Sequence, residues 1–220
     1  QDATVTALVA QIEGLAAPPV LVDYKERART IAQRAKHAVV NISMAGTGAL
    51  ISSDGYIVTN AHVVADMASV TVVMFDGRTY QGDVVATVSS LDPDLALVKI
   101  DGHDFPFLPL AKEATVGAVV VYIGHPQAIY WTSAGGKIVG ITDRLISSQD
   151  GFSGLEEEIL DGILQRKWTE VTYTNPTTGG SSGSPLLNCA GEIVAIVYGM
   201  GIEATEPEKT STIYQNDVIW

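Results

Sequence analysis

The feature that most constrains the fold of this chain is a series of short β-branched segments that runs from Val39 to Tyr198. Turn signals such as Asp76-Gly77 separate the segments, which is typical of strands joined by hairpins. The expected strands cover residues 39–42, 48–51, 56–59, 70–74, 83–88, 96–100, 118–123, 137–142, 170–173 and 193–198. Helical segments do not alternate with them, as they would in a parallel α/β fold. The pattern therefore predicts an all-β fold, a barrel or a sandwich.

Two stretches depart from this pattern and carry apolar residues at helical spacing. Between Asp23 and Ala38 the apolar positions recur at i, i+3, i+4 and i+7, which predicts an amphipathic helix with Asp23 as its N-cap. Residues 147–167 combine a polar loop with a shorter helical pattern, and we expect this insertion to be more mobile than the strands. The chain is thus predicted to hold a partly helical N-terminal extension, residues 1–38, and one β domain, residues 39–220.

Composition and charge exclude several classes of protein. The 220 residues carry 13 Lys and Arg against 25 Asp and Glu, and the resulting net charge of −12 repels the phosphate backbone of nucleic acids. The longest apolar stretch, residues 116–124, is far shorter than the roughly 20 residues that a membrane-spanning helix needs. Cys189 is the single cysteine, so no internal disulfide can form. The four histidines lie far apart in the sequence, so we expect no metal site and no other cofactor.

Three segments carry residues that together suit nucleophilic catalysis. His62 follows a predicted strand, Asp94 precedes a buried one, and Ser182 lies in a glycine-rich turn before an apolar strand. A serine hydroxyl is a weak nucleophile until a base takes its proton, and imidazole, with an ordinary pKa near 6.5, suits that task. A carboxylate on the other ring nitrogen fixes the tautomer and stabilises the imidazolium that forms. The order His, Asp, Ser is that of the chymotrypsin lineage and differs from the orders in subtilisin and the α/β-hydrolases.

Neighbouring residues of the same type compete for two of these roles. Asp92 competes with Asp94, but an Asp directly before a proline is typical of a turn. Ser181 and Ser184 compete with Ser182, and the Gly-x-Ser-Gly frame favours the middle serine. The sequence therefore favours His62, Asp94 and Ser182 as the reacting set.

The other histidines and the cysteine receive no role in the chemistry. His37, His103 and His125 are expected to be structural or exposed. Contact of His125 or of the N-terminus with the substrate pocket stays an open alternative. Cys189, next to Asn188 at a strand end or turn, is expected to be an inert small residue.

The segments around His62 and Asp94 resemble the HtrA (Deg) branch of the trypsin-like serine proteases. In that branch Thr-Asn-Ala-His-Val-Val and Asp-Leu-Ala-Leu-x-Lys-Ile flank the catalytic His and Asp, and this chain has both, at residues 59–64 and 94–100. Its Ile-Gly-His-Pro turn, residues 123–126, is similar to the Ile-Gly-Asn-Pro turn of that branch. The serine segment, residues 177–185, reads Thr-Thr-Gly-Gly-Ser-Ser-Gly-Ser-Pro and resembles the bacterial glutamyl endopeptidases instead.

The resemblance implies two antiparallel six-stranded β-barrels with the site in the cleft between them. The first barrel is expected over about 39–105 and the second over about 115–205, with the insertion at 147–167 near the cleft. Many HtrA proteins are trimers joined by their N-terminal segments, but residues 1–35 here contain one aromatic, Tyr24, which argues against the same trimer. A homo-oligomer of another kind stays an open alternative. We expect an extracytoplasmic location, secreted or periplasmic.

The resemblance also implies a mechanism. His62 is the implied base, Asp94 the orienting acid and Ser182 the nucleophile. The backbone N–H groups of Gly180 and Ser182 are the implied oxyanion donors. The implied activity is endopeptidase hydrolysis of protein or peptide substrates through an acyl-enzyme, with no metal or organic cofactor.

In relatives, the pocket for the side chain before the scissile bond is built from residues just before the nucleophile and from a later strand. These positions map here to Thr177, Thr178, Val197, Tyr198, Gly199 and Met200. Glutamyl endopeptidases place a histidine where this chain has Val197, and Lys/Arg-specific relatives carry an Asp on the pocket floor that is absent here. Because burying an unpaired charge costs several kcal/mol, we expect a preference for uncharged aliphatic side chains.

Three other functions fit the same residues. The alternatives are a catalytically silent protease-like binding scaffold, a glutamyl-specific endopeptidase and an esterase that uses the same three side chains. The presence of the whole triad and of the oxyanion glycine argues against the scaffold. Relative rates on peptide and ester substrates distinguish the peptidase from the esterase.

Overall fold

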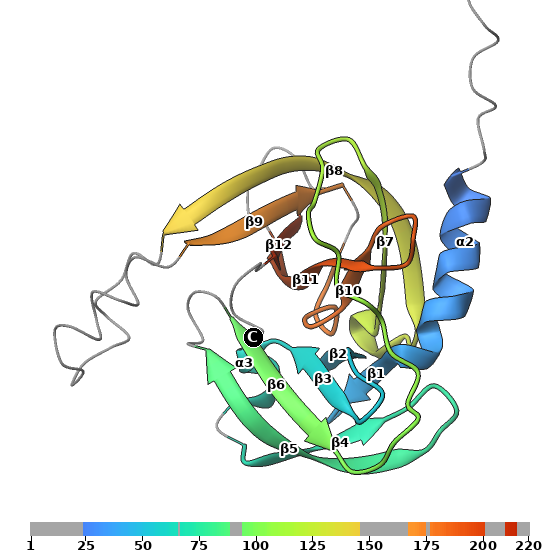
Figure 1. The fold of residues 1–220 in the computed structure, drawn as a ribbon, viewed down its shortest axis with the longest axis vertical. Helices are drawn as coiled ribbons and strands as arrows, with labels where there is room; N and C mark the ends of the chain where they lie inside the picture. Colours follow the sequence, from blue (N-terminus) through green and yellow to red (C-terminus); the bar gives the residue numbers. More distant parts are fainter. Residues whose placement is uncertain are drawn as a thin grey trace, which may run out of the picture.

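The computed structural model describes residues 24–65, 67–88, 94–145, 167–174, 177–200 and 210–214 (Figure 1). Its strands form two closed antiparallel barrels of six strands each. The prediction of an all-β fold with two six-stranded barrels and an N-terminal helix is therefore confirmed. All ten expected strands are present, with ends that differ by a few residues.

The first barrel has the strand order β1-β2-β3-β6-β5-β4. Its strands are β1 (Val39–Ile42), β2 (Gly46–Leu50), β3 (Tyr56–Thr59), β4 (Ser69–Val73), β5 (Thr79–Val88) and β6 (Leu95–Ile100). β1 and β2 are buried along their whole length. In β4 buried and more exposed residues alternate, as expected for a strand with one face towards the core and the other towards solvent. Tight turns join β1 to β2, β2 to β3 and β4 to β5, which explains why turn signals marked these strand ends so well.

The second barrel has the strand order β10-β11-β12-β9-β8-β7. Its strands are β7 (Val119–Gly124), β8 (Thr132–Leu145), β9 (Lys167–Tyr173), β10 (Pro185–Leu187), β11 (Ile193–Met200) and β12 (Thr210–Tyr214). β10 is the apolar strand expected after the Ser182 turn, whereas β12 was not expected. β10 is only three residues long and follows directly on a glycine-rich turn, and β12 lies beyond residue 205, where the second barrel was expected to end.

The N-terminal helix α2 (Tyr24–Ala35) packs against β7 and β8 of the second barrel, beside them in Figure 1. The predicted apolar face is buried, and its residues are Ala28, Ile31, Ala32 and Ala35. A 3-10 turn η1 (Lys36–Ala38) then leads into β1 of the first barrel. The predicted N-cap Asp23 and the insertion at 147–166 lie outside the described residues.

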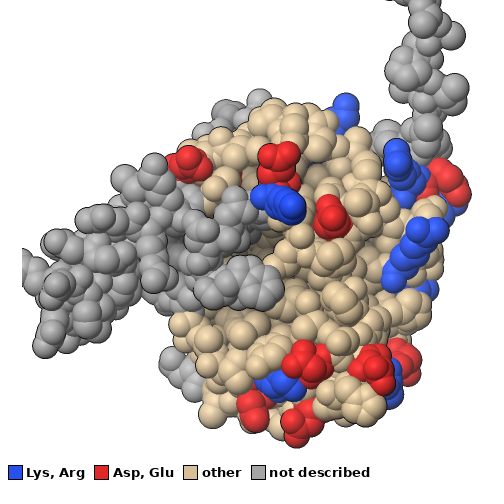
Figure 2. Space-filling view, viewed as in Figure 1, with Lys and Arg blue, Asp and Glu red and all other residues tan. Residues whose placement is uncertain are grey.

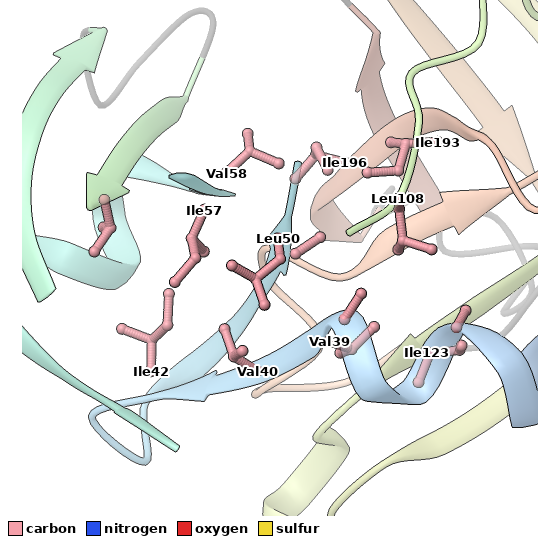
Figure 3. Close-up of a cluster of buried hydrophobic side chains, with 14 of the residues drawn as sticks. Val39, Val40, Ile42, Leu50, Ile57, Val58, Leu108, Ile123, Ile193 and Ile196 are labelled. Atoms are coloured by element: carbon pink, nitrogen blue, oxygen red, sulfur yellow. The ribbon is translucent and has the colours of Figure 1, made fainter. Parts of the chain in front are cut away.

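One apolar core continues across both barrels. Figure 3 shows Leu50 and Ile57 of the first barrel in the same cluster as Ile123 and Ile193 of the second, with Leu108 from the connecting segment between them. A smaller second cluster fills the interior of the second barrel. Because close-packed apolar interiors deform little, this shared core fixes how the two barrels face each other.

On the face shown in Figure 2, charged side chains lie along α2, over the first barrel and in a small group over the second barrel. Figure 2 shows Lys and Arg gathered along α2 and a mixture of both signs over the strands of the first barrel, with largely uncharged surface between. Within the part of the chain that the structure describes, no helix has the length and apolar character needed to cross a membrane.

Candidate active site

His62 lies in α3 (Ala61–Val64), a single helical turn that begins where β3 ends. Ala61, Val63 and Val64 are buried, so the turn is anchored in the first barrel. The His62 side chain is 43% exposed, so its ring reaches the surface of the molecule. The local sequence thus holds the backbone of His62 rigidly while leaving its ring accessible.

The strand register brings Asp94 to His62. Thr59 at the end of β3 pairs with Ala96 near the start of β6, so the residues just after β3 and just before β6 lie side by side. Asp94 is 5% exposed and accepts from His62 Nδ1 on one carboxylate oxygen and from the His62 backbone N–H, at 2.9 Å, on the other. Asn60 Nδ2 donates to the Asp94 carbonyl at 2.8 Å. These contacts fix the carboxylate and the ring in one relative orientation.

This pairing determines which nitrogen of His62 is available. A carboxylate only accepts hydrogen bonds, so the proton between the two side chains belongs to Nδ1. Nε2 of the neutral ring then carries a lone pair on the side away from Asp94. The imidazole of His62 is therefore oriented to accept a proton from a group in front of Nε2.

Ser182 lies in a tight turn that precedes β10, here called the serine turn, residues 178–184. Within it, Ser181 N donates to Thr178 O at 3.0 Å and Ser184 N donates to Ser181 O at 3.0 Å. The Ser182 carbonyl accepts from Thr47 N of β2 at 2.8 Å. A turn of the second barrel is thus bonded directly to a strand of the first.

Two glycines allow this close docking. Gly183 has φ +80°, and a Cβ there would lie 1.8 Å from a backbone carbonyl oxygen of β2. At Gly46 a Cβ would lie 2.6 Å from Val63 Cγ2 and 3.2 Å from the Ser182 carbonyl oxygen. Gly46 is therefore wedged between α3, which carries His62, and the serine turn. The backbone segments that carry His62 and Ser182 consequently meet at this junction.

The serine turn also fixes the direction of two backbone N–H groups. The Gly179 carbonyl accepts from Gln127 N at 2.7 Å, and the Ser181 carbonyl accepts from a later N–H of the same turn. In a trans peptide unit the N–H points opposite to the C=O, so the N–H groups of Gly180 and Ser182 point away from these partners. Neither donates a hydrogen bond to any residue that the structure describes. Two unpaired N–H groups on one turn suit an oxyanion.

The hydroxyl of Ser182 and the ring of His62 are not hydrogen-bonded to each other in the described structure. Hydrogen bonds between nucleophile and base are often long or poorly aligned without substrate and tighten when substrate binds.

His125 lies buried behind the serine turn. It is 2% exposed, and its ring packs edge-on against Trp131 with the centroids 4.9 Å apart. Nδ1 lies 2.9 Å from Thr47 Oγ1, whereas Nε2 has no hydrogen-bond partner among the described residues. Burial lowers the pKa of His125 to about 4, because the imidazolium would lose its hydration. Sequence analysis did not single out Thr47, which is remote from His125 in the chain and carries no motif of its own.

Two of the predicted pocket residues contact the serine turn. Val197 is buried and makes two backbone hydrogen bonds with the turn, from Gly183 N at 2.8 Å and to Ser184 O at 2.9 Å. Thr178 is exposed and accepts the hydrogen bond from Ser181 N that closes the turn.

The remaining predicted pocket residues lie on either side of these. Thr177 is buried, and its hydroxyl has no hydrogen-bond partner within the described chain. Tyr198 is half-buried, with its hydroxyl 3.4 Å from Glu170 Oε1, and Gly199 pairs with Ser211 of β12. Glu170, 7% exposed on β9, was not singled out from the sequence. Its one sequence signal is an acid inside a predicted strand.

The other polar candidates lie elsewhere. His37 packs against Phe75 with the ring centroids 5.1 Å apart, and the exposed His103 bonds to its neighbour Asp104, in line with the structural or exposed roles expected of them. Cys189 is exposed. Among the described residues, no group of three or more His, Cys, Asp or Glu side chains is arranged to hold a metal ion. Asp92, the competitor of Asp94, falls outside the described ranges.

A family profile described as "Trypsin-like peptidase domain" matches residues 46–196. This chain belongs to that family. Within it, the chain is HtrA/DegP-like, because serine proteases that bear these names align with most of its length. The trypsin-like fold agrees with the two closed barrels.

Two curated relatives and one solved structure illustrate the similarity. "Probable periplasmic serine endoprotease DegP-like" of Pseudomonas fluorescens is 33% identical over 202 residues, which are 87% of this chain and 36% of that protein. "Serine protease HTRA2, mitochondrial" of Bos taurus is 35% identical over 157 residues, 69% of this chain and 30% of that protein. The HtrA-like chain thus spans about a third of the length of these relatives. The inactive form of a serine-to-alanine mutant of Rv3671c from M. tuberculosis H37Rv is 26% identical, with a TM-score of 0.69 over 92% of this chain and 91% of that one.

Proposed function

We propose that this HtrA-like chain is a serine endopeptidase in which Ser182 is the nucleophile, His62 the general base and Asp94 the orienting acid. The observation that carries the proposal is the double hydrogen bond from His62 to Asp94, made where the serine turn docks onto the first barrel. It leaves His62 Nε2 as a proton acceptor at the junction with the serine turn, which supplies the Ser182 hydroxyl, two unpaired N–H groups and the glycines that allow close approach.

The proposed reaction has two halves. Ser182 Oγ attacks the carbonyl carbon of the scissile bond while its proton passes to His62 Nε2, and the electron pair of the C=O bond moves onto oxygen. When the C–N bond breaks, His62 gives that proton to the leaving amine and an acyl-enzyme remains. Water then attacks the ester by the same route, and the proton returns through His62 to Ser182. Asp94 stabilises the imidazolium in both halves and stays ionised.

The backbone N–H groups of Gly180 and Ser182 are the proposed donors to the oxyanion. Their directions are set by hydrogen bonds to the carbonyls of the preceding residues, so the groups need no reorganisation as charge develops. Removing one such donor in other serine proteases lowers kcat by about 10²–10³-fold. The same order of contribution is expected here.

Peptide hydrolysis by triad variants tests the assignment. If the three side chains act as one unit, Ser182→Ala and His62→Ala each lower kcat by several orders of magnitude, and the double variant is scarcely slower than either. Ser184→Ala is the matched control, because its buried hydroxyl has no partner among the described residues and its loss leaves the reacting groups in place. Additive losses in the single and double variants would contradict the proposal.

We further propose a preference for uncharged, small to medium aliphatic side chains before the scissile bond. Val197 is fully buried and apolar, and no basic side chain lies among the pocket residues that the structure describes. The buried carboxylate of Glu170, which contacts the Tyr198 hydroxyl, adds negative charge beside this set and opposes an acidic side chain. A peptide-library cleavage profile dominated by Val, Ala or Leu supports this preference; one dominated by Glu, or by Lys and Arg, overturns it.

Two alternatives remain open to the same assays. A binding scaffold predicts no Ser182-dependent turnover on any substrate, and an esterase predicts that ester substrates are cleaved while peptides of matched sequence are not.

We also propose that residues 1–38 are an extension to a protease domain at 39–220, and that the protein is extracytoplasmic, since relatives are named as periplasmic or mitochondrial. Cell fractionation with antibody detection tests the location.

A further inference from the structure

Behind the serine turn, Thr47 joins the two barrels through its side chain. Its Oγ1 donates to the Gly180 carbonyl at 2.9 Å and lies 2.9 Å from His125 Nδ1 and 3.2 Å from the His125 backbone N. Thr47 is fully buried and His125 is 2% exposed, so water does not compete for these contacts. We propose that Thr47 and His125 are positioning residues that hold Gly180 so that its N–H faces the reacting carbonyl. This inference rests on the proposed function.

The count of donors and acceptors defines the role of each group. The Thr47 hydroxyl has one proton, and the Gly180 carbonyl, which only accepts, takes it. Towards His125 the hydroxyl oxygen must therefore accept, so the ring carries its proton on Nδ1. The backbone N–H of His125 donates to the same oxygen. His125 thus supplies two donors that orient the Thr47 hydroxyl, and the hydroxyl in turn orients Gly180.

Gly180 is held between two fixed peptide units. On one side, the Gly179 carbonyl accepts from Gln127 N at 2.7 Å, which directs the Gly180 N–H the opposite way. On the other, the Gly180 carbonyl accepts from Thr47 Oγ1, which fixes the next unit. The Gly180 backbone approaches His125 so closely that a Cβ there would lie 2.2 Å from the His125 carbonyl oxygen. Releasing either carbonyl would let Gly180 rotate, because a glycine with φ +92° has no side chain to oppose rotation.

The turn that holds His125 is itself strained and braced. Gln127 and Ala128 have φ values of +49° and +60°, a left-handed conformation that costs a non-glycine residue free energy. Trp131, whose ring packs on His125, anchors the end of this turn by donating from Nε1 to the Val39 carbonyl at 3.1 Å. Backbone strain of this kind persists only where surrounding contacts determine the conformation, which agrees with a positioning role.

Steady-state kinetics of Thr47 variants test the proposal. Thr47→Val keeps the branched shape but removes the hydroxyl, and we expect kcat per titrated site to fall about 10- to 100-fold with KM little changed, since the loss is one of transition-state stabilisation. Affinity for a peptide aldehyde, which forms a tetrahedral adduct, weakens by the same factor. Thr47→Ser keeps the hydroxyl and restores kcat to within a few-fold of wild type. Ser52→Ala is the control, because it removes one hydroxyl contact to a first-barrel backbone N–H away from the site.

A second variant keeps the test decisive if Thr47→Val folds poorly. His125→Phe retains an aromatic ring against Trp131 and removes both ring nitrogens, and we expect the same fall in kcat. In the double variant with Thr47→Val, kcat falls little further than in either single variant, because both residues act through Gly180. Full kcat per titrated site in folded Thr47→Val or His125→Phe overturns the inference. That result leaves the proposed function intact provided that wild-type turnover is abolished by Ser182→Ala. Absence of Ser182-dependent turnover in the wild type refutes the proposed function instead.

Discussion

Burial of His125 makes the stability of this protein depend on pH. The folded protein holds the pKa of His125 at about 4, whereas an imidazole in the unfolded chain titrates near its ordinary 6.5. Between these values the unfolded chain binds a proton that the folded protein does not. The free energy of unfolding is therefore not reduced by His125 above about pH 6.5. It falls as the pH drops from about 6.5 towards 4, because only the unfolded chain takes up the proton. One pKa unit corresponds to about 1.4 kcal/mol, so the loss amounts to about 3 kcal/mol.

Urea unfolding of wild type and His125→Phe at pH 7.5 and at pH 4 measures this effect. A Ser182→Ala background prevents self-cleavage, and subtracting the two proteins cancels the carboxyl groups that titrate in both. We expect the free energy of unfolding of wild type, relative to His125→Phe, to fall by about 3 kcal/mol between the two pH values. His103→Gln, which removes an exposed imidazole, is the matched substitution control. Parallel pH profiles for wild type and His125→Phe would refute the reasoning.

Three further predictions follow from packing and from the proposed triad. Gly183→Ala places a Cβ 1.8 Å from a carbonyl oxygen at φ +80°, and we expect it to lower the free energy of unfolding by more than about 2 kcal/mol. Gly77→Ala, with a similar φ and open space around the new Cβ, lowers it by about 1 kcal/mol. Equal losses in urea unfolding would contradict this. Asp94→Asn lowers kcat about 10⁴-fold with the fold unchanged by circular dichroism, and a loss below tenfold would count against its role. Leu50→Ala removes a fully buried side chain and costs about 2–5 kcal/mol, against under about 0.5 kcal/mol for the half-exposed Val85→Ala, both by urea unfolding.

The β architecture was accessible from sequence because turn residues mark hairpin ends. The partnership of His62 with Asp94 was expected from the order of the residue types and from the resemblance to the HtrA branch. The strand pairing that brings Asp94 beside His62 joins β3 and β6, which are not consecutive in the chain, so no hairpin signal predicts it. The helix over 24–35 was predictable, because its buried face repeats at the helical period.

Contacts that depend on the docking of the two barrels were not accessible. Thr47, His125 and Gly180 come from three remote segments, and nothing in their neighbouring sequence pairs them. β12 was missed because it follows a long polar stretch after β11. His125 was expected to be structural or exposed, and its burial against the serine turn follows from tertiary packing that a local pattern does not encode.

The central claim, that Ser182 is a nucleophile activated by His62, is tested most directly by covalent labelling with a fluorophosphonate followed by mass spectrometry of the digested protein. The serine turn holds three serine hydroxyls, of which Ser181 and Ser184 are buried and Ser182 is partly exposed. We predict one phosphonyl group per chain, located on Ser182, with labelling slowed by several orders of magnitude in His62→Ala. A label on another serine, or labelling at an undiminished rate without His62, would contradict the assignment.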